Sequence, residues 1–141
     1  MILYCDTSAL IKLLVQEPGS DRLQRVSSEA EAIAVCRVTW AEAMAAMARR
    51  QREDPLSSSD LEQARQLLIR TWAQFLIVEI SQRLVESAGR YADAFALRGY
   101  DSVQLAAAHE LHRSTALPIT FACSDRRLNQ AAQLLQLGVL A

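Results

Sequence analysis

Residues 2–8, Ile2-Leu3-Tyr4-Cys5-Asp6-Thr7-Ser8, join a short apolar run to an acid and two hydroxyl side chains. The four apolar residues are typical of a short buried strand. Thr7 and Ser8 are good N-cap residues, so a helix is expected to follow at once and to run through Leu14. A buried strand that passes directly into a helix is typical of a βαβ unit, which predicts an α/β fold with a mainly parallel sheet.

The same alternation continues along the rest of the chain. Further strands are predicted at residues 32–36, 75–80, 119–123 and 139–140. Helices are predicted at residues 21–29, 39–52, 59–73, 82–97, 102–113 and 126–137. The helices 39–52 and 59–73 are separated only by Asp54-Pro55 and a loop at 56–58, so we expect a helical hairpin. Helices between parallel strands should cover both faces of the sheet.

The composition indicates one globular domain over residues 1–141. Hydrophobic residues make up 51% of the chain, enough for a sizeable core. No apolar run approaches the roughly 20 residues of a membrane helix, and the first residues lack the features of a signal peptide. Three cysteines without a C-x-x-C pair indicate reduced, buried thiols rather than a zinc ribbon or a disulfide framework. We therefore expect a cytoplasmic protein with no membrane partner.

The charges give no strong overall field. The net charge is −1, which argues against a globally basic nucleic-acid-binding surface. Lys12 is the only lysine, and the other fourteen of the fifteen cations are arginines. Arginine is suited to bidentate contact with phosphate, although a GC-rich genome would also produce this bias. The cation type alone therefore leaves both explanations open.

Four acids stand at chain junctions, and they are Asp6, Glu42, Asp101 and Asp125. If the strands are parallel, three of these acids leave the carboxyl edge of one sheet, where open α/β folds bind ligands. Carboxylates gathered at one edge repel each other unless a cation lies between them. Mg²⁺ is the usual hard cation at such a site. The pattern predicts a metal-dependent phosphoryl-transfer enzyme.

Each acid also has a purely structural interpretation. Asp6, Asp101 and Asp125 each precede a helix and could serve as N-caps. Glu42 ends Thr39-Trp40-Ala41-Glu42, which fits a capping box. The coincidence of four acids at neighbouring junctions favours a functional site over four unrelated caps.

Other catalytic classes lack their motifs. His109 and His112 are three residues apart on a predicted helix, but no Cys or carboxylate stands at a spacing that would support a zinc site. The chain has no P-loop, no dinucleotide-binding glycine motif and no G-x-S-x-G nucleophile elbow. A phospho-acceptor receiver domain would need paired acids after the first strand and a lysine after a late strand, and both are missing.

Four segments together resemble those of PIN-domain endoribonucleases, and the layout is similar to that of VapC-type toxins of toxin–antitoxin pairs. They are residues 4–10, Thr39-Trp40-Ala41-Glu42, residues 99–106 and Ser124-Asp125-Arg126-Arg127-Leu128. The resemblance implies a three-layer α/β/α PIN-like fold in which Asp6, Glu42, Asp101 and Asp125 hold Mg²⁺ or Mn²⁺. One departure is Cys123, where many members carry Ser or Thr two residues before the last acid.

The resemblance also implies partners. The substrate would be RNA, cut to leave a 5′-phosphate and a 3′-hydroxyl, with Arg49, Arg126 and Arg127 as candidate backbone contacts. A small antitoxin would block the site, and a homodimer is expected. The hairpin residues Trp40, Met44 and Met47 share one helix face and are a candidate antitoxin dock, or they belong to the core. A catalytically inactive PIN-like module that binds RNA or protein is the alternative.

Overall fold

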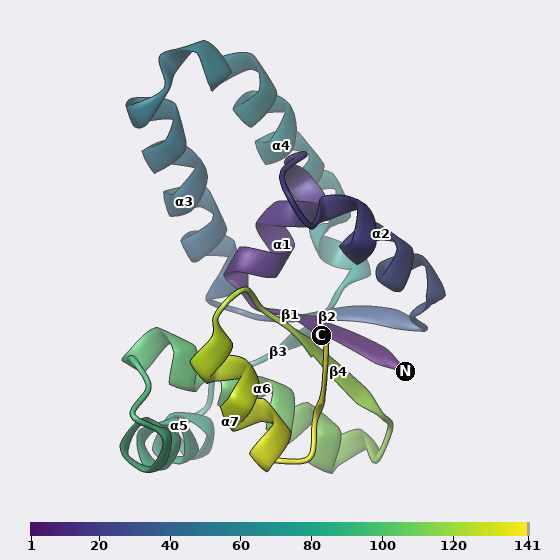
Figure 1. The fold of residues 1–141 in the computed structure, drawn as a ribbon, viewed down its shortest axis with the longest axis vertical. Helices are drawn as coiled ribbons and strands as arrows, with labels where there is room; N and C mark the ends of the chain where they lie inside the picture. Colours follow the sequence, from purple (N-terminus) through teal and green to yellow (C-terminus); the bar gives the residue numbers. More distant parts are fainter. Residues whose placement is uncertain (141) are drawn as a thin grey trace.

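A parallel five-stranded sheet forms the centre of the protein, as seen in the computed structural model, which describes residues 1–140 (Figure 1). The strands are β1 (Ile2–Cys5), β2 (Ala32–Cys36), β3 (Leu76–Val78), β4 (Ile119–Ala122) and β5 (Gly138–Val139). They lie in the order β3-β2-β1-β4-β5, and every neighbouring pair is parallel. Central β1 aligns Ile2 with Ala32 of β2 and with Ile119 of β4. The predicted parallel sheet is confirmed.

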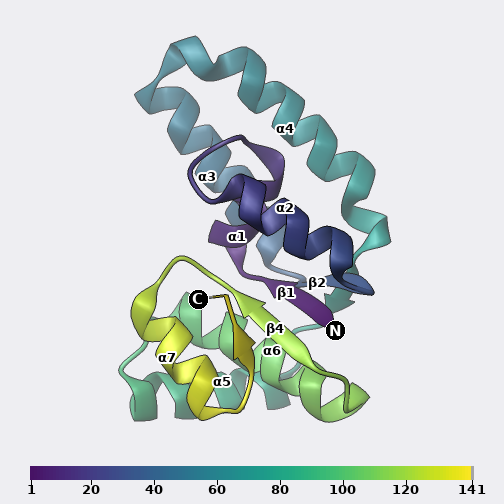
Figure 2. The ribbon, with the colours of Figure 1, turned by 45° about the vertical axis from the view of Figure 1, so that its right-hand side comes forward.

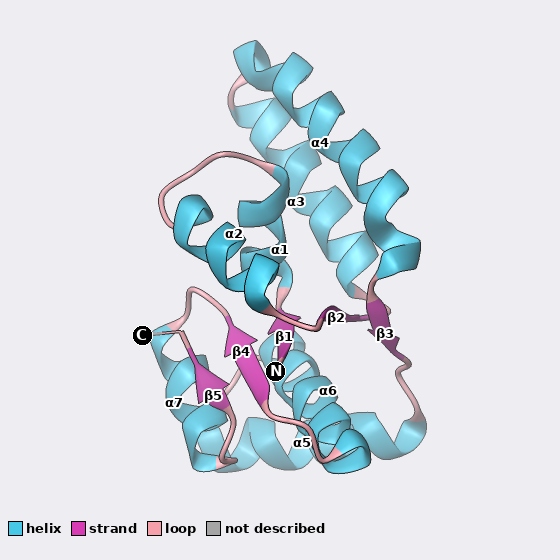
Figure 3. Cartoon of the chain, turned by 90° about the vertical axis from the view of Figure 1, so that its right-hand side faces the viewer, coloured by secondary structure: helices cyan, strands magenta, loops and turns pink. Residues whose placement is uncertain are grey.

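Helices cover both faces of this sheet (Figures 1 and 3). They are α1 (Thr7–Leu14), α2 (Ser20–Glu29), α3 (Thr39–Glu53), α4 (Ser58–Thr71), α5 (Gln82–Phe95), α6 (Gly99–Thr115) and α7 (Arg126–Leu134), with short 3₁₀ helices η1 (Pro55–Ser57) and η2 (Trp72–Gln74). Within residues 1–140, none of the helices is both long and apolar enough to cross a membrane.

The alternation of side chains along β1 divides the core into two clusters. Ile2 and Tyr4 pack with residues of α5, α6 and α7 on one face. Leu3 and Cys5 pack with residues of α1, α2, α3 and α4 on the other. Because successive strand residues point to opposite faces, the short run 2–5 contributes to both clusters and must be apolar throughout. All four of these residues are buried.

The predicted hairpin is formed by α3 and α4, which extend together beyond the sheet (Figure 2). Trp40 near its base packs edge to face against Trp72, with ring centroids 5.2 Å apart. Met47 is fully buried, and Trp40 and Met44 pack partly buried against the same cluster. The interpretation as core is therefore confirmed for Met47, whereas antitoxin docking at the partly exposed Trp40 and Met44 stays a prediction.

Several element boundaries differ from the prediction. The loop expected at 56–58 is largely the 3₁₀ helix η1, and α4 begins at Ser58, one residue before the predicted start. Strand β3 is limited to three residues because it lies at the sheet edge and pairs only with β2. Helix α6 begins at Gly99 rather than at residue 102, because Arg98 is its N-cap. Helix α7 ends before residue 137, because Gln136 takes a left-handed conformation.

Two leucines of α7 test which helix face the fold depends on. Leu128 is fully buried whereas Leu134 is 71% exposed. Leu128→Ala should lower the free energy of unfolding by about 2–5 kcal/mol through lost burial and a new cavity, and Leu134→Ala by less than about 1 kcal/mol. Urea denaturation of both variants measures the difference. Equal effects would contradict the packing of α7 described above.

Candidate active site

A cleft of about 710 Å³ opens at the carboxyl edge of the sheet. Three of the four junction acids line it: Asp6 directly after β1, Glu42 in the first turn of α3, and Asp101 in the first turn of α6. The remaining lining residues are Thr7, Ser8, Ile11, Lys12, Glu17, Ala46, Arg49, Arg50, Arg98, Gln104 and Ser124. The fold thus brings together carboxylates that lie 95 positions apart in the chain, between Asp6 and Asp101.

Asp6 is a buried carboxylate, with only 6% of its surface exposed. Its Oδ1 accepts hydrogen bonds from the Ser8 hydroxyl at 2.7 Å and from the Ala9 amide at 2.9 Å, so it also caps α1. Burial raises the pKa of Asp6 to about 6, against the lowering effect of these two hydrogen bonds. The nearby charges of Asp101 and Glu42 raise it further. The N-cap interpretation is therefore correct but incomplete.

Glu42 does not form the capping box that its sequence allowed. The N-cap of α3 is Val38, and the Thr39 hydroxyl donates to Cys36 Sγ instead. Glu42 Oε1 accepts hydrogen bonds from the Thr7 hydroxyl at 3.0 Å and from Gln104 Nε2 at 2.8 Å. Its carboxylate is therefore turned toward the cleft rather than back to the helix backbone.

Gln104, which lines the cleft, contacts Glu42 with a side-chain amide whose orientation is set by Tyr4. Its side chain is almost fully buried, and its Oε1 accepts from the Tyr4 hydroxyl at 2.6 Å. Burial raises the pKa of Tyr4, so this hydroxyl stays protonated and donates. The amide nitrogen of Gln104 must then face Glu42 and the Thr39 hydroxyl at 3.0 Å. Sequence reasoning missed Gln104, although a glutamine one turn after Asp101 on an apolar helix is a usable signal.

The other two acids differ in position. Asp101 is not a cap, because Arg98 occupies the N-cap of α6. Burial raises the pKa of Asp101, Asp125 raises it further, and Arg98 opposes both. Asp125 caps α7 by accepting from the Leu128 amide at 2.8 Å, and it is exposed outside the residues that line the cleft. Its cap interpretation is confirmed, and its link to the cleft is its electrostatic effect on Asp101.

The acids lack cationic partners. None of the ion pairs formed within residues 1–140 includes Asp6, Glu42, Asp101 or Asp125. In the same range, no three His, Cys, Asp or Glu side chains form a ready-made metal-ligand group. Asp101 and Glu42 nevertheless raise the pKa of Asp6, and Asp125 raises the pKa of Asp101, effects that a bound cation would relieve. An all-oxygen donor set of this kind fits Mg²⁺ or Mn²⁺ rather than a soft metal.

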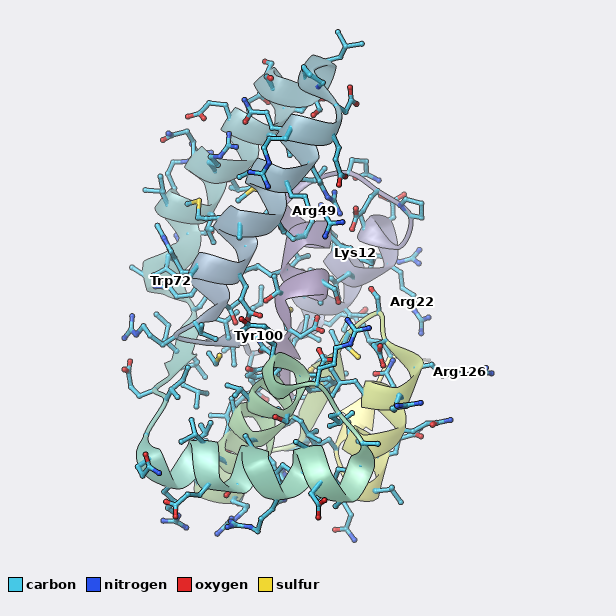
Figure 4. The ribbon with its side chains drawn as sticks, turned by 90° about the vertical axis from the view of Figure 1, so that its left-hand side faces the viewer. Lys12, Arg22, Arg49, Trp72, Tyr100 and Arg126 are labelled. Atoms are coloured by element: carbon cyan, nitrogen blue, oxygen red, sulfur yellow. The ribbon has the colours of Figure 1, made fainter. Side chains whose placement is uncertain are left out.

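The basic residues of the cleft are mostly not those expected from the sequence. Arg49 lines it, with its Nε bound to Glu53 at 2.9 Å. Arg126 and Arg127 do not line it: Arg127 donates to the Ala96 carbonyl, and Figure 4 shows Arg126 pointing from α7 into solvent. The other cations of the cleft are Lys12, Arg50 and Arg98, which sequence reasoning did not select.

Cys123 has a structural role close to the cleft. Its Sγ lies 3.2 Å from Asn129 Oδ1 and 3.3 Å from the Asp125 carbonyl, so its single S–H is shared between two acceptors. Burial and the charge of Asp6 raise the pKa of its thiol to about 12, so it is not a thiolate near neutral pH. The hydroxyl nearest the acids is instead that of Ser8, which also accepts from the Ser124 amide at 3.1 Å.

The buried charge of Asp6 predicts a measurable effect on stability. Its pKa is about 6 in the folded chain against the ordinary 3.8, so the folded state binds more protons between these values. The resulting stabilisation is present at low pH and is lost as the pH rises through about 6. Asp6→Asn keeps the N-cap and removes the charge, and should raise the free energy of unfolding near neutral pH in EDTA by on the order of 2 kcal/mol.

The gain should shrink toward about pH 4, where Asp6 is protonated. Thermal melts at both pH values measure it, with Asp125→Asn as the control because it also replaces a cap aspartate but at an exposed position. A destabilised Asp6→Asn variant near neutral pH would show that its charge is not a cost to the fold.

Comparison with known proteins places this geometry in a family. The model of the PIN domain family matches residues 3–134. Ribonuclease VapC49 of Mycobacterium tuberculosis is 34% identical over 131 residues, covering 93% of this chain and 89% of its own. Ribonuclease VapC46 of the same species is 30% identical over 139 residues, covering 99% and 96%.

Solved structures share the fold at lower identity. A toxin-antitoxin complex from Klebsiella pneumoniae aligns over 100% of this chain and 97% of its own with a TM-score of 0.67 at 20% identity. VapBC2 from Rickettsia felis, bound to a DNA fragment from its promoter, aligns over 99% and 98% with a TM-score of 0.66 at 11% identity. The family match and the two M. tuberculosis relatives show that this chain belongs to the PIN domain family and groups there with the VapC ribonucleases.

Proposed function

We propose that this chain is a single-domain, metal-dependent endoribonuclease that acts as the toxin of a toxin–antitoxin pair. One observation carries the proposal: the carboxylates of Asp6, Glu42 and Asp101 meet in one cleft, and none of them forms an ion pair with another residue of the described range 1–140. A buried carboxylate whose pKa is raised by burial and by neighbouring acids, as that of Asp6 is, is costly to the fold and typical of a functional site. The similarity to named VapC ribonucleases supports RNA as the substrate.

The residues would share the work as follows. Asp6 and Asp101 would bind Mg²⁺ or Mn²⁺ directly, and Glu42 and Asp125 would bind directly or through water. When bound, such a cation lowers the pKa of a water molecule and neutralises charge on the phosphoryl oxygens. The Ser8 hydroxyl and the Ala9 amide hold Asp6 in place, and Thr7 and Gln104 hold Glu42.

The RNA would lie in the cleft with its backbone toward the acids. Single-stranded or looped RNA exposes its phosphates and bases to a site of this kind, whereas the major groove of a duplex is too narrow to be read by side chains. Arg49 and Arg98 line the cleft beside the acids and would contact neighbouring phosphates. Arg126 and Arg127, which project elsewhere, remain candidates only for RNA that extends past the start of α7.

The partners follow from the same family. Two of the structural neighbours are described as a toxin-antitoxin complex and as VapBC2, which supports a small antitoxin as the protein partner of this chain. The ribonuclease itself would act in the cytoplasm, where RNA is available. A homodimer is also proposed, and exposed apolar side chains near β3 and α5 offer it surface: Leu76 is 42% exposed, Ile80 37% and Val85 36%.

Cleavage of a mixed RNA pool tests the nuclease. Purified protein should cut in Mg²⁺ or Mn²⁺ and not in EDTA, and Asp101→Asn should slow cutting at least about a hundredfold because a metal ligand is lost. Asp93→Asn, at an exposed position of α5 outside the cleft, should cut normally. Folded protein that binds RNA but never cuts it would make this chain an inactive PIN-like binding module.

Light scattering after gel filtration tests the dimer. At micromolar concentration, the particle mass should be twice the 15.7 kDa of one chain. A single-chain mass at that concentration would contradict the proposed homodimer.

A further inference from the structure

One wall of the cleft carries a compact cluster of three charged side chains, which pair with one another and not with Asp6, Glu42 or Asp101 in the described part of the chain. Glu17 Oε1 lies 3.0 Å from Lys12 Nζ, and Glu17 Oε2 lies 2.7 Å from Arg50 Nη2. The three residues come from α1, from the α1–α2 loop and from α3, and all of them line the cleft with Asp6, Glu42 and Asp101. Glu17 is thus bonded through both of its carboxylate oxygens.

The α1–α2 loop is built to present Glu17 in this position. The Glu17 amide donates to the Ser20 hydroxyl at 3.0 Å, and that hydroxyl donates to the Val15 carbonyl at 3.0 Å. Ser20 is fully buried, and its hydroxyl joins residues 15 and 17 of the same loop by hydrogen bonds. Gly19 has a φ of +94°, and a Cβ there would lie 3.4 Å from Lys12 Cδ and Cε. The hydrogen bonds of Ser20 therefore hold the loop at Glu17, and the stem of Lys12 passes close to Gly19.

The cluster keeps donors available for an anion. Glu17 is 17% exposed, whereas the side chains of Lys12 and Arg50 are 25% and 41% exposed. An ammonium and a guanidinium each carry further N–H donors beyond the one bound to Glu17. Burial would raise the pKa of Glu17, but hydrogen bonds from Lys12 and Arg50 outweigh it and lower the pKa. One carboxylate between two cations leaves the cluster with a net positive charge next to the acid site.

We infer that Lys12 and Arg50 form a phosphate-binding subsite for the RNA backbone, with Glu17 as the residue that positions both cations. The subsite rests on the proposed ribonuclease function and adds to it the place where a phosphate beside the scissile one is held. Pairing with Glu17 keeps the two cations from neutralising Asp6, Glu42 and Asp101, so the acids stay available for a metal ion. A guanidinium with a fixed orientation is well suited to a phosphodiester.

Salt-dependent binding tests the subsite without requiring cleavage. A fluorescein-labelled single-stranded RNA 20-mer of random sequence is titrated with wild-type protein, Lys12→Gln, Arg50→Gln and Glu17→Gln in EDTA, at several NaCl concentrations, and followed by anisotropy. Each cation variant should bind roughly tenfold more weakly. Each should also reduce the slope of log affinity against log salt by about 0.7, the value of one lost phosphate contact on a single strand.

Arg65→Gln is the matched control. Arg65 is also an arginine in an ion pair, 3.2 Å from Glu62, but it lies on the hairpin outside the cleft. It should leave affinity and slope unchanged. Glu17→Gln should weaken binding even though it removes a negative charge, because Lys12 and Arg50 lose the carboxylate that orients them. Tighter binding by Glu17→Gln would overturn the positioning role.

Thermal melts of each variant separate the subsite from a structural staple. Folded Lys12→Gln and Arg50→Gln proteins that bind RNA with wild-type affinity and slope would show that the cluster only joins α1 to α3, and would overturn the proposal. Cleavage of the mixed pool in Mg²⁺ is measured beside it. Wild-type protein that binds RNA but does not cut it refutes the nuclease, while the comparison of variants still decides the subsite.

Discussion

The parallel pairing of β1 with both β2 and β4 is the constraint on which the rest of the molecule depends. Because the three central strands run in one direction, the chain leaves all of them at the same edge. The pairing continues past the strand end, where the Asp6 amide donates to the Ala122 carbonyl at 3.1 Å. This bond fixes the backbone of a buried carboxylate, and α1 and α3 begin beside it. The meeting of Asp6, Glu42 and Asp101 in one cleft therefore follows from strand direction.

Burial of a charged carboxylate is the main cost of this arrangement, and repulsion between the acids adds to it. The fold places Asp6 in the core without a cation and brings Glu42 and Asp101 close enough to raise its pKa. Neutral hydrogen-bond donors carry the compensation: Ser8 and Ala9 for Asp6, Thr7 and Gln104 for Glu42. Such donors orient a carboxylate without cancelling its charge, as the proposed metal site requires.

Positive charge in the cleft is kept apart from the acid site by its own partner. Lys12 and Arg50 pair with Glu17 and not with the metal-binding candidates. Had these cations paired with Asp6 or Asp101, they would have lowered the pKa of the acids and occupied the place of a metal. Buried Ser20 and left-handed Gly19 maintain the separation by shaping the loop that carries Glu17. The three acids and the cations Lys12 and Arg50 therefore line one cleft without pairing with each other among the described residues.

The alternation of strands and helices, the parallel sheet, the hairpin and the acids at the junctions can all be predicted from the amino-acid sequence. These features are local: apolar runs, breakers and cap residues report on their own neighbours in the chain. The ends of the elements depend on tertiary contacts and are not predicted as well. Strand β3 ends where its neighbour β2 ends, and α4 continues from a 3₁₀ turn.

The acids that face the cleft, and the cations that line it with them, could be identified only from the tertiary structure. Glu42 met its capping-box pattern locally, yet its carboxylate bonds to Gln104, which is 62 positions away. Arg126 and Arg127 follow an acid directly in sequence but project outside the cleft, whereas Lys12 and Arg50 meet there through Glu17. Side-chain partners of this kind depend on strand order and helix placement. The residues next to a side chain in the sequence do not specify which distant residue it will contact.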